Sequence, residues 1–313
     1  MEKRLNTRKV AERYKTGQHL NIEELKENCR HLDNRYLDKD NIPDYPRPEF
    51  HVSHLKHDTA SSGLEGIYRD GGFRGNDSLL WWSLAVKPED ITAAEARFLE
   101  KTFPDRTEEQ VKNQESFLGR FATSPAFSEK SRMGSYRFTL SLEQILEAYS
   151  QQFCAGAQPV LQVYETVLYK QEVMYVVLVG TKADPRYPSL GNNPNAVCAY
   201  DDGRFIWRSQ AMCETHRLEM NLIPGEKRIK VELWPYNHQF YVWDHFAVAM
   251  RINPGQVLKF DRDELRRNLT YCELGDLKLT LEEMPDFAEA QEHVNTLWPD
   301  VSAPLEKEVP LLP

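Results

Sequence analysis

The chain has 313 residues, of which 41% are hydrophobic and 11% aromatic, so it can bury a sizeable core in one large domain or two of ordinary size. Its formal net charge of −9 at pH 7 argues against a general affinity for nucleic-acid phosphates or anionic membranes. No window approaches the roughly 18 apolar residues of a membrane span. From the charge and from this absence, we expect neither a membrane nor a nucleic acid as a partner.

The first 45 residues are charged and polar, and they predict a peripheral helical arm. Asn21 can cap a short helix in which Ile22, Leu25 and Cys29 share one apolar side. Three closely spaced prolines follow and force an extended chain before the first predicted strand.

The next region alternates strands with helices. Apolar residues at helical spacing, preceded by Pro88 and followed closely by acidic residues, predict one helix, and Ser141 can cap another. Gly71 and Gly72 end a third. The predicted strands are 50–55, 79–86 and 136–140, and the predicted helices are 63–68, 88–102, 105–118 and 142–149.

β-Structure dominates the remainder. Residues 159–169 and 172–179 are rich in β-branched and aromatic side chains and predict a long hairpin. Asp-Asp-Gly at 201–203 predicts the turn of a second hairpin, between strands 197–200 and 204–207. Further predicted strands are 229–233, 240–243, 246–252 and 257–260, with helices at 261–268 and 286–297.

Together these elements predict an α+β fold with mostly antiparallel, twisted β-sheets and peripheral helices. Loop signals between residues 184 and 194 suggest a division there, into either two closely packed lobes or two parts of one continuous body. The predicted parts are an N-terminal helical arm (1–45), an α+β region (46–185), a β-rich C-terminal region packed on it (186–300) and a tail (301–313).

Three short segments carry the pattern that points most directly to a chemistry. His-Val-Ser at 51–53 precedes a helix with Leu64 and Ile67. Phe-Ala-Thr-Ser-Pro-Ala-Phe occupies 121–127, and Leu-Tyr-Lys-Gln-Glu at 168–172 opens a predicted strand. In order and placement these segments resemble those of ADP-ribosyltransferases and poly(ADP-ribose) polymerases, so that 46–185 becomes an ADP-ribosyltransferase-like region. The chain departs from that pattern in having phenylalanine at 121, where the family places a stacking tyrosine.

The resemblance implies that NAD is bound as a substrate, for transfer of ADP-ribose or for hydrolysis. His51 would hold the ribose and nicotinamide, and Glu172 would stabilise the positive charge that develops on the ribose as nicotinamide leaves. The further NAD-binding residues that it implies are Ser53, Phe121, Ser124 and Tyr169. The partners would be a nucleotide and a protein target.

The same residues also fit a different class of protein, and the sequence leaves open whether the chain is an enzyme. His51 is then an ordinary strand histidine and Glu172 a solvent-facing hairpin residue. The chain would be a non-enzymatic cytosolic interaction or scaffold protein with an aromatic-lined binding surface. The aromatic residues that would line this surface or pack in the core are Trp81, Trp82, Trp207, Trp234, Tyr236, Phe240, Tyr241 and Trp243.

Two other groups of residues were weighed as sites. His51, His54 and His57 are the residue type that binds zinc, but positions three apart on a strand point to opposite faces, so we predict no metal site. Cys213 and His216 are close in sequence, which does not show that a thiol and its base meet in space.

The five cysteines predict a reduced, cytoplasmic protein. They are far apart, they form no Cys-x-x-Cys pair, and the start of the chain lacks the apolar run of a secretory signal. We therefore expect five free thiols when the denatured protein is titrated with a thiol reagent under non-reducing conditions. A titration that misses two or more of them would contradict this prediction.

Overall fold

The computed structural model describes the chain except for residues 7, 31–33, 35, 39–46, 76, 122–123, 128–129, 214–215, 222–229, 236–240, 276–278 and 309–313. The strands are β1 (Glu2–Leu5), β2 (Ala11–Thr16), β3 (Glu49–Val52), β4 (His54–Thr59), β5 (Gly72–Arg74), β6 (Leu79–Leu84), β7 (Tyr136–Ser141), β8 (Val160–Tyr169), β9 (Glu172–Gly180), β10 (Cys198–Asp201), β11 (Arg204–Arg208), β12 (Met212–Cys213), β13 (His216–Asn221), β14 (Lys230–Pro235), β15 (Tyr241–Arg251), β16 (Val257–Lys259), β17 (Leu269–Tyr271) and β18 (Glu306–Lys307). The helices are α1 (Ile22–Cys29), α2 (Ser61–Asp70), α3 (Pro88–Thr102), α4 (Glu108–Lys112), α5 (Leu142–Phe153), α6 (Arg262–Arg267) and α7 (Phe287–Leu297), with 3-10 turns η1 (Leu118–Phe121) and η2 (Pro125–Phe127). None of the helices in these described ranges is both long and apolar enough to cross a membrane.

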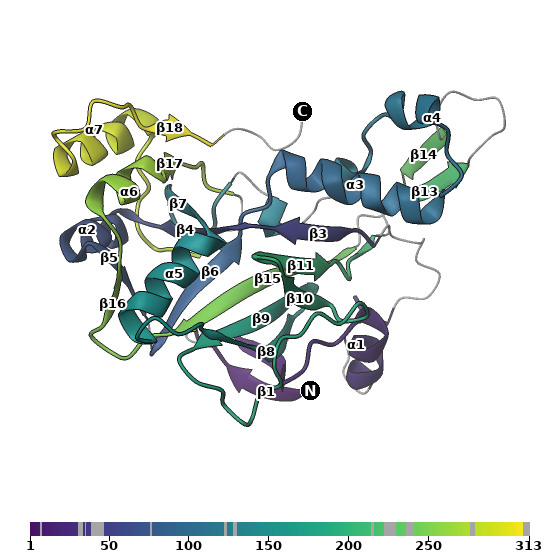
Figure 1. The fold of residues 1–313 in the computed structure, drawn as a ribbon, viewed down its shortest axis with the longest axis horizontal. Coiled ribbons are helices and arrows are strands. Elements are labelled where there is room, and N and C mark those ends of the chain that lie inside the picture. Colours follow the sequence, from purple (N-terminus) through teal and green to yellow (C-terminus); the bar gives the residue numbers. More distant parts are fainter. Residues whose placement is uncertain are drawn as a thin grey trace.

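A large mixed sheet runs through the middle of the molecule (Figure 1). Its strand order is β1-β2-β8-β9-β15-β6-β4-β7-β17-β18, with β12 paired to β15. The strands pair antiparallel except for β9 with β15 and β17 with β18. With its peripheral helices, this arrangement confirms the predicted α+β class.

β15 joins the two larger regions predicted from the sequence. It comes from residues 186–300 but lies between β9 and β6, which belong to residues 46–185. The two regions therefore share one sheet. Residues 240–243 and 246–252, predicted as separate strands, are continuous in β15 over its described residues, Tyr241–Arg251.

The large sheet has two unlike faces, as the alternation along β9 shows. Val173, Tyr175 and Val177 belong to the main hydrophobic core, whereas Val176 and Leu178 belong to a second, smaller apolar cluster. We call the first side the core face and the second the polar face. By strand register, the polar face carries Glu165 of β8, Glu172 of β9, Trp81 of β6, Lys56 of β4, Arg137 of β7, and Trp243, His245 and Arg251 of β15.

The core face is covered by helices and by a small sheet. Apolar residues of α1 and α5 are part of the main core, as are those of the three-stranded sheet β10-β11-β3. Figure 1 shows α5 and the strands β10 and β11 lying over the large sheet. On the polar face, charged side chains instead form ion pairs with one another.

Local signals correctly predicted most helices and both hairpins. α3 spans the predicted residues, and Ser141 caps α5 by accepting a hydrogen bond from the Gln144 amide. The second hairpin turns at Asp202 and Gly203, which both have positive φ, as a type I′ turn requires.

The helix predicted at 105–118 is wrong in its extent, because only α4 forms there. Oε2 of the buried Glu95 accepts hydrogen bonds from the backbone amides of Phe117 and Leu118, at 2.8 and 2.7 Å. In a continuing helix these amides would donate to carbonyls four residues back, so the Glu95 carboxylate favours a turn instead.

The first 45 residues contain the predicted helix and also an unpredicted hairpin. Asn21 caps α1, and Ile22, Leu25 and Cys29 are buried as expected. β2 pairs with β8 and β1 pairs with β2, so this hairpin extends the large sheet. Neither strand shows apolar alternation, so local pattern could not reveal them.

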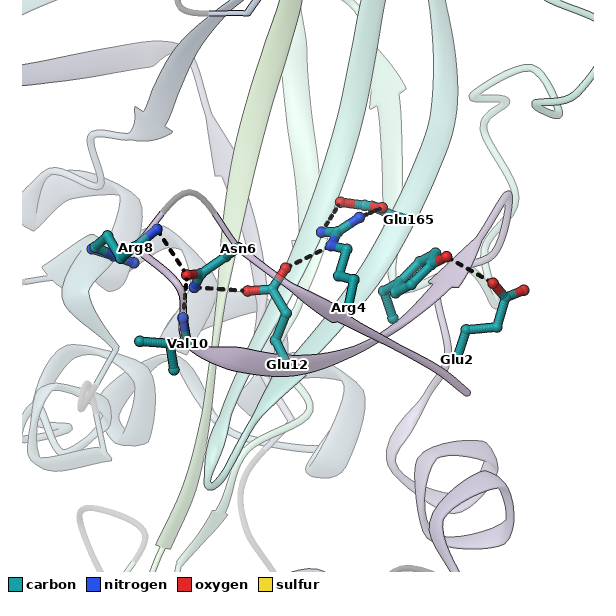
Figure 2. A network of polar contacts seen from close by, with 8 residues as sticks. Glu2, Arg4, Asn6, Arg8, Val10, Glu12 and Glu165 are labelled. Atoms are coloured by element: carbon teal, nitrogen blue, oxygen red, sulfur yellow. Dashed lines mark hydrogen bonds and ion pairs between the residues drawn. The ribbon is translucent and has the colours of Figure 1, made fainter.

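An arginine fixes this hairpin to the sheet (Figure 2). Arg4 donates both terminal nitrogens to the Glu165 carboxylate at 2.7 Å and its Nε to Glu12, also at 2.7 Å. The Tyr14 ring lies 4.4 Å from the guanidinium carbon. A bidentate pair with a buried carboxylate gives both strength and a fixed geometry, so it specifies where the hairpin docks.

A buried carboxylate connects the small sheet to the large one. Asp244 of β15 accepts hydrogen bonds from Trp207 Nε1 at 2.9 Å, from Ser209 Oγ at 2.7 Å and from the Gln210 amide at 2.9 Å. Burial raises the pKa of Asp244, and the three hydrogen bonds oppose that rise. β11 and the segment after it are thus held to β15 by one side chain.

We predict that Asp244→Ala lowers the free energy of unfolding by about 3–5 kcal/mol, because it leaves buried donors without an acceptor. Asp244→Asn keeps one oxygen acceptor and the shape, so its loss should be smaller. Urea denaturation of both variants checks this order. Equal losses would contradict this prediction, because they would show that the oxygen acceptor and the shape retained by asparagine contribute nothing.

Candidate functional site

Glu172 begins β9 and has aromatic residues on both sides. It pairs with Trp243 of β15 in parallel register and with Tyr169 of β8 across the hairpin. Directly paired residues project to the same face of a sheet, so all three side chains lie on the polar face. Each is partly buried, and Lys170 makes the tight turn with a φ of 54°.

The Glu172 carboxylate lies between an arginine and a histidine. Arg132, from the loop before β7, donates its two terminal nitrogens to the two carboxylate oxygens, each at 3.3 Å. His245 Nε2 lies 3.2 Å from Glu172 Oε1. The Trp243 ring centroid is 5.7 Å from the Arg132 guanidinium carbon and 5.8 Å from the His245 ring centroid. We call these four residues the Glu172 cluster.

These contacts keep Glu172 ionised. Burial alone would raise the pKa of its carboxyl group, but contact with His245 and Arg132 outweighs burial and lowers the pKa to about 2. A fixed negative charge therefore lies beside a cation and an indole ring on a strand paired on both sides. Such a site can accept hydrogen bonds and stabilise a developing positive charge.

The Arg132–Glu172 pair is looser than three other arginine–carboxylate pairs of the polar face, although shorter than the 3.6 Å contact between Arg137 and Glu308. Three others have N–O distances of 2.6 to 2.7 Å, against 3.3 Å here. The shorter pairs are Arg4–Glu165, Arg137–Asp58 and Arg251–Asp184. The three shorter pairs have the N–O distances usual for charge-assisted hydrogen bonds, as expected of ion pairs that hold the fold together. The longer Arg132–Glu172 contact is weaker, so both side chains can form further hydrogen bonds.

His51 and Glu172 lie on strands of different sheets. His51 is on β3 of the three-stranded sheet, and its Nε2 is 2.7 Å from Glu49 Oε1. Ser53 follows β3, and its Oγ is 3.0 Å from His54 Nδ1. The polar contacts described for His51 and for Glu172 involve different partners. β3 pairs with β11 in the small sheet that covers the core face, whereas Glu172 projects from the polar face. The structure of the described residues therefore does not place His51 and Glu172 on neighbouring strands, and it does not bring them into a common pocket.

The remaining predicted NAD-binding residues have varied positions. Tyr169 is next to Glu172 on the polar face, with Lys170 Nζ 5.2 Å from its ring centroid. Ser124 is buried, and its Oγ accepts a hydrogen bond from the Ala126 amide, a local role in η2. Phe121 ends η1, and its side chain lies outside the part that the structure describes. Of these three residues, Tyr169 is the one that lies next to Glu172, because β8 pairs with β9 at that point.

The three histidines each have a separate environment. His54 Nε2 is 3.2 Å from Lys87 Nζ, and His57 Nδ1 is 2.9 Å from the Trp81 carbonyl, with the His57 ring packed against Phe73. Within the described ranges, no group of three His, Cys, Asp or Glu residues is placed to hold a metal ion. The side chains of Cys213 and His216 fall outside those ranges.

The sequence interpretation missed Arg132, His245 and the role of Trp243. Arg132 lies in a loop with no recognisable motif. His245 and Trp243 alternate with buried residues along β15, which is a signal for a two-faced strand. Only the parallel pairing of β15 with β9, however, brings them to Glu172.

A cavity of about 540 Å³ lies elsewhere, between α2, β7 and α7. In it Tyr136 Oη is 3.1 Å from His293 Nδ1, and His293 Nε2 is 3.3 Å from Glu65. Three strands separate β7 from β9 in the sheet, so this cavity is distinct from the Glu172 cluster. The remaining lining residues are Ser61, Glu283, Met284, Pro285, Glu289, Glu292 and Thr296.

Comparison with known proteins adds no assignment. The chain matches no protein-family model, and searches of curated proteins and of solved structures find no match.

The low pKa of Glu172 predicts a pH-dependent stability. A carboxyl group whose folded pKa is lowered stabilises the fold above its unfolded pKa, and this contribution is lost as the pH falls toward the folded value. A change from 4.5 to about 2 corresponds to about 3 kcal/mol. The difference in unfolding free energy between wild type and Glu172→Gln should therefore shrink between pH 6 and pH 3. Urea denaturation across this range measures it, and a difference independent of pH would contradict the assigned ionisation.

Proposed function

We propose that the Glu172 cluster binds NAD or a related nucleotide and that the chain is an ADP-ribosyltransferase-like protein. The observation that carries the proposal is an ionised carboxylate fixed beside a guanidinium and an indole ring. A nucleotide has a group that matches each of these three: the carboxylate, the guanidinium and the indole ring. Ribose hydroxyls donate to a carboxylate, phosphates pair with arginine, and a base or nicotinamide ring stacks on an aromatic side chain.

The position of Glu172 also suits the chemistry. As the bond from ribose C1′ to the nicotinamide nitrogen breaks, its electron pair leaves with nicotinamide and positive charge develops on the ribose. A nearby carboxylate stabilises that charge, and water or a protein nucleophile then forms the new bond to C1′. β9 is paired on both sides, so it can hold Glu172 with little movement.

A second candidate is the interaction or scaffold protein with an aromatic-lined surface. One observation favours it: Trp81 is 36% exposed and lies on the polar face, where it pairs with Ala249 of β15. Exposed tryptophan is enriched at the centres of protein interfaces. In this alternative, Glu172, Arg132 and His245 contribute polar contacts to a protein partner.

In both cases we propose a cytoplasmic location. It is supported by the free thiols of the four described cysteines Cys29, Cys154, Cys198 and Cys272.

We predict that the wild-type protein binds NAD and releases nicotinamide, and that Glu172→Gln retains most of the binding but loses a hundredfold or more in release, about 3 kcal/mol. Glutamine keeps the shape and one acceptor but not the charge. Calorimetry with NAD and a nicotinamide-release assay measure the two effects separately.

Glu12→Gln is the matched control, because Glu12 is also an arginine-bound carboxylate but belongs to the Arg4 network. It should leave both measurements unchanged. No binding at millimolar NAD would favour the interaction protein, and equal turnover in wild type and Glu172→Gln would remove Glu172 from the reaction.

A further inference from the structure

The Glu172 cluster contains donors with no acceptor. Among the described residues, six buried side-chain polar nitrogens have no hydrogen-bond partner, and Arg132 Nε and His245 Nε2 are two of them. Such groups cost free energy when they are left unsatisfied, so two in one cluster point to an acceptor supplied from outside the chain.

The geometry of Arg132 indicates where that acceptor would bind. Its two terminal nitrogens face Glu172, so one edge of the guanidinium is occupied. The edge that contains Nε has no acceptor and is buried. Because a guanidinium presents its five donors around a planar fork, movement of the side chain would let this edge take a second acceptor. The nearby Trp243 ring helps to hold this plane in place.

His245 offers a second donor to the same region. Its Nε2 is 3.2 Å from Glu172 Oε1. In the structure this nitrogen has no hydrogen-bond partner. It can therefore donate to a ligand oxygen placed between the two side chains.

The loop that carries Arg132 is already ordered by its backbone. Ser131 Oγ accepts hydrogen bonds from the amides of Met133 and Gly134, and the Arg132 carbonyl accepts one from Leu279 at 2.7 Å. A ligand would consequently require movement of the Arg132 side chain and not of its backbone. A site with a fixed backbone pays a small ordering cost when it binds.

We infer that Arg132 and His245 form an oxyanion site that binds a phosphoryl group of the ligand, adjacent to the Glu172 carboxylate. This inference rests on the proposed function in that it names the part of the nucleotide that these residues take. Glu172 repels the phosphoryl group but accepts a hydrogen bond from the neighbouring ribose hydroxyl. The loose Arg132–Glu172 contact lets Arg132 serve both anions at once.

Inorganic pyrophosphate is the probe, measured by calorimetry at low ionic strength. The wild type should bind it, and Arg132→Gln and Arg132→Lys should each weaken binding by tenfold or more, because lysine keeps the charge but has neither Nε nor the fork. Glu172→Gln should tighten binding severalfold, since it removes the neighbouring negative charge. A purely structural role for the cluster would not produce these opposite signs.

Arg69→Gln is the control, because Arg69 is highly exposed on α2 and should not affect pyrophosphate binding. Unfolding midpoints verify that each variant is folded. Absence of pyrophosphate binding in wild type, or equal binding in Arg132→Gln and wild type, would overturn the inference. NAD binding that is unchanged in Arg132→Gln would also overturn it while leaving the proposed function in place. Arg132-dependent pyrophosphate binding without NAD binding would support the oxyanion site and reject the nucleotide proposal.

Discussion

The arrangement of the site depends on the buried carboxylate of Asp244. This side chain points to the core face, where it binds the indole of Trp207 and the segment that follows β11. Its neighbours in β15, Trp243 and His245, must then point to the opposite face, because side chains alternate along a strand. A slip of one residue would bury those two rings and expose the carboxylate. Asp244 thus fixes the register in which β15 presents its polar residues to Glu172.

The polar face shows how one side of a sheet can carry many charges. Its arginines and carboxylates are arranged in pairs, three of which have a largely buried carboxylate and N–O distances of 2.6 to 2.7 Å. A buried pair of this kind is costly to break, because removing one partner leaves the other charge uncompensated. The 3.3 Å contacts of Arg132 are longer than those of these three pairs. The same types of residue hold structure where they are tight and can exchange partners where they are loose.

Sequence reasoning was most accurate where the signal is local. The capping residues Asn21 and Ser141, the turn at Asp202 and the periodicity of residues 88–102 each depend on a few neighbouring positions. Glu172 was singled out through the short motif around it. The residues that surround it arrive from a distant loop and strand, so their proximity is a property of sheet topology. The hairpin β1–β2 was not predicted for a related reason, since its attachment depends on backbone pairing with β8 and on the Arg4–Glu165 ion pair, and not on an apolar pattern.

The Arg4–Glu165 pair has a consequence for the time course of folding. Its two residues are separated by 161 positions, and β2 has no sheet to join until β8 exists. Contacts between residues so far apart in sequence form slowly, because the entropy of closing the intervening loop must be overcome first. The β1–β2 hairpin can therefore reach its place only after β8 has formed. Once β8 has formed, its outer edge stays unpaired until the hairpin docks on it.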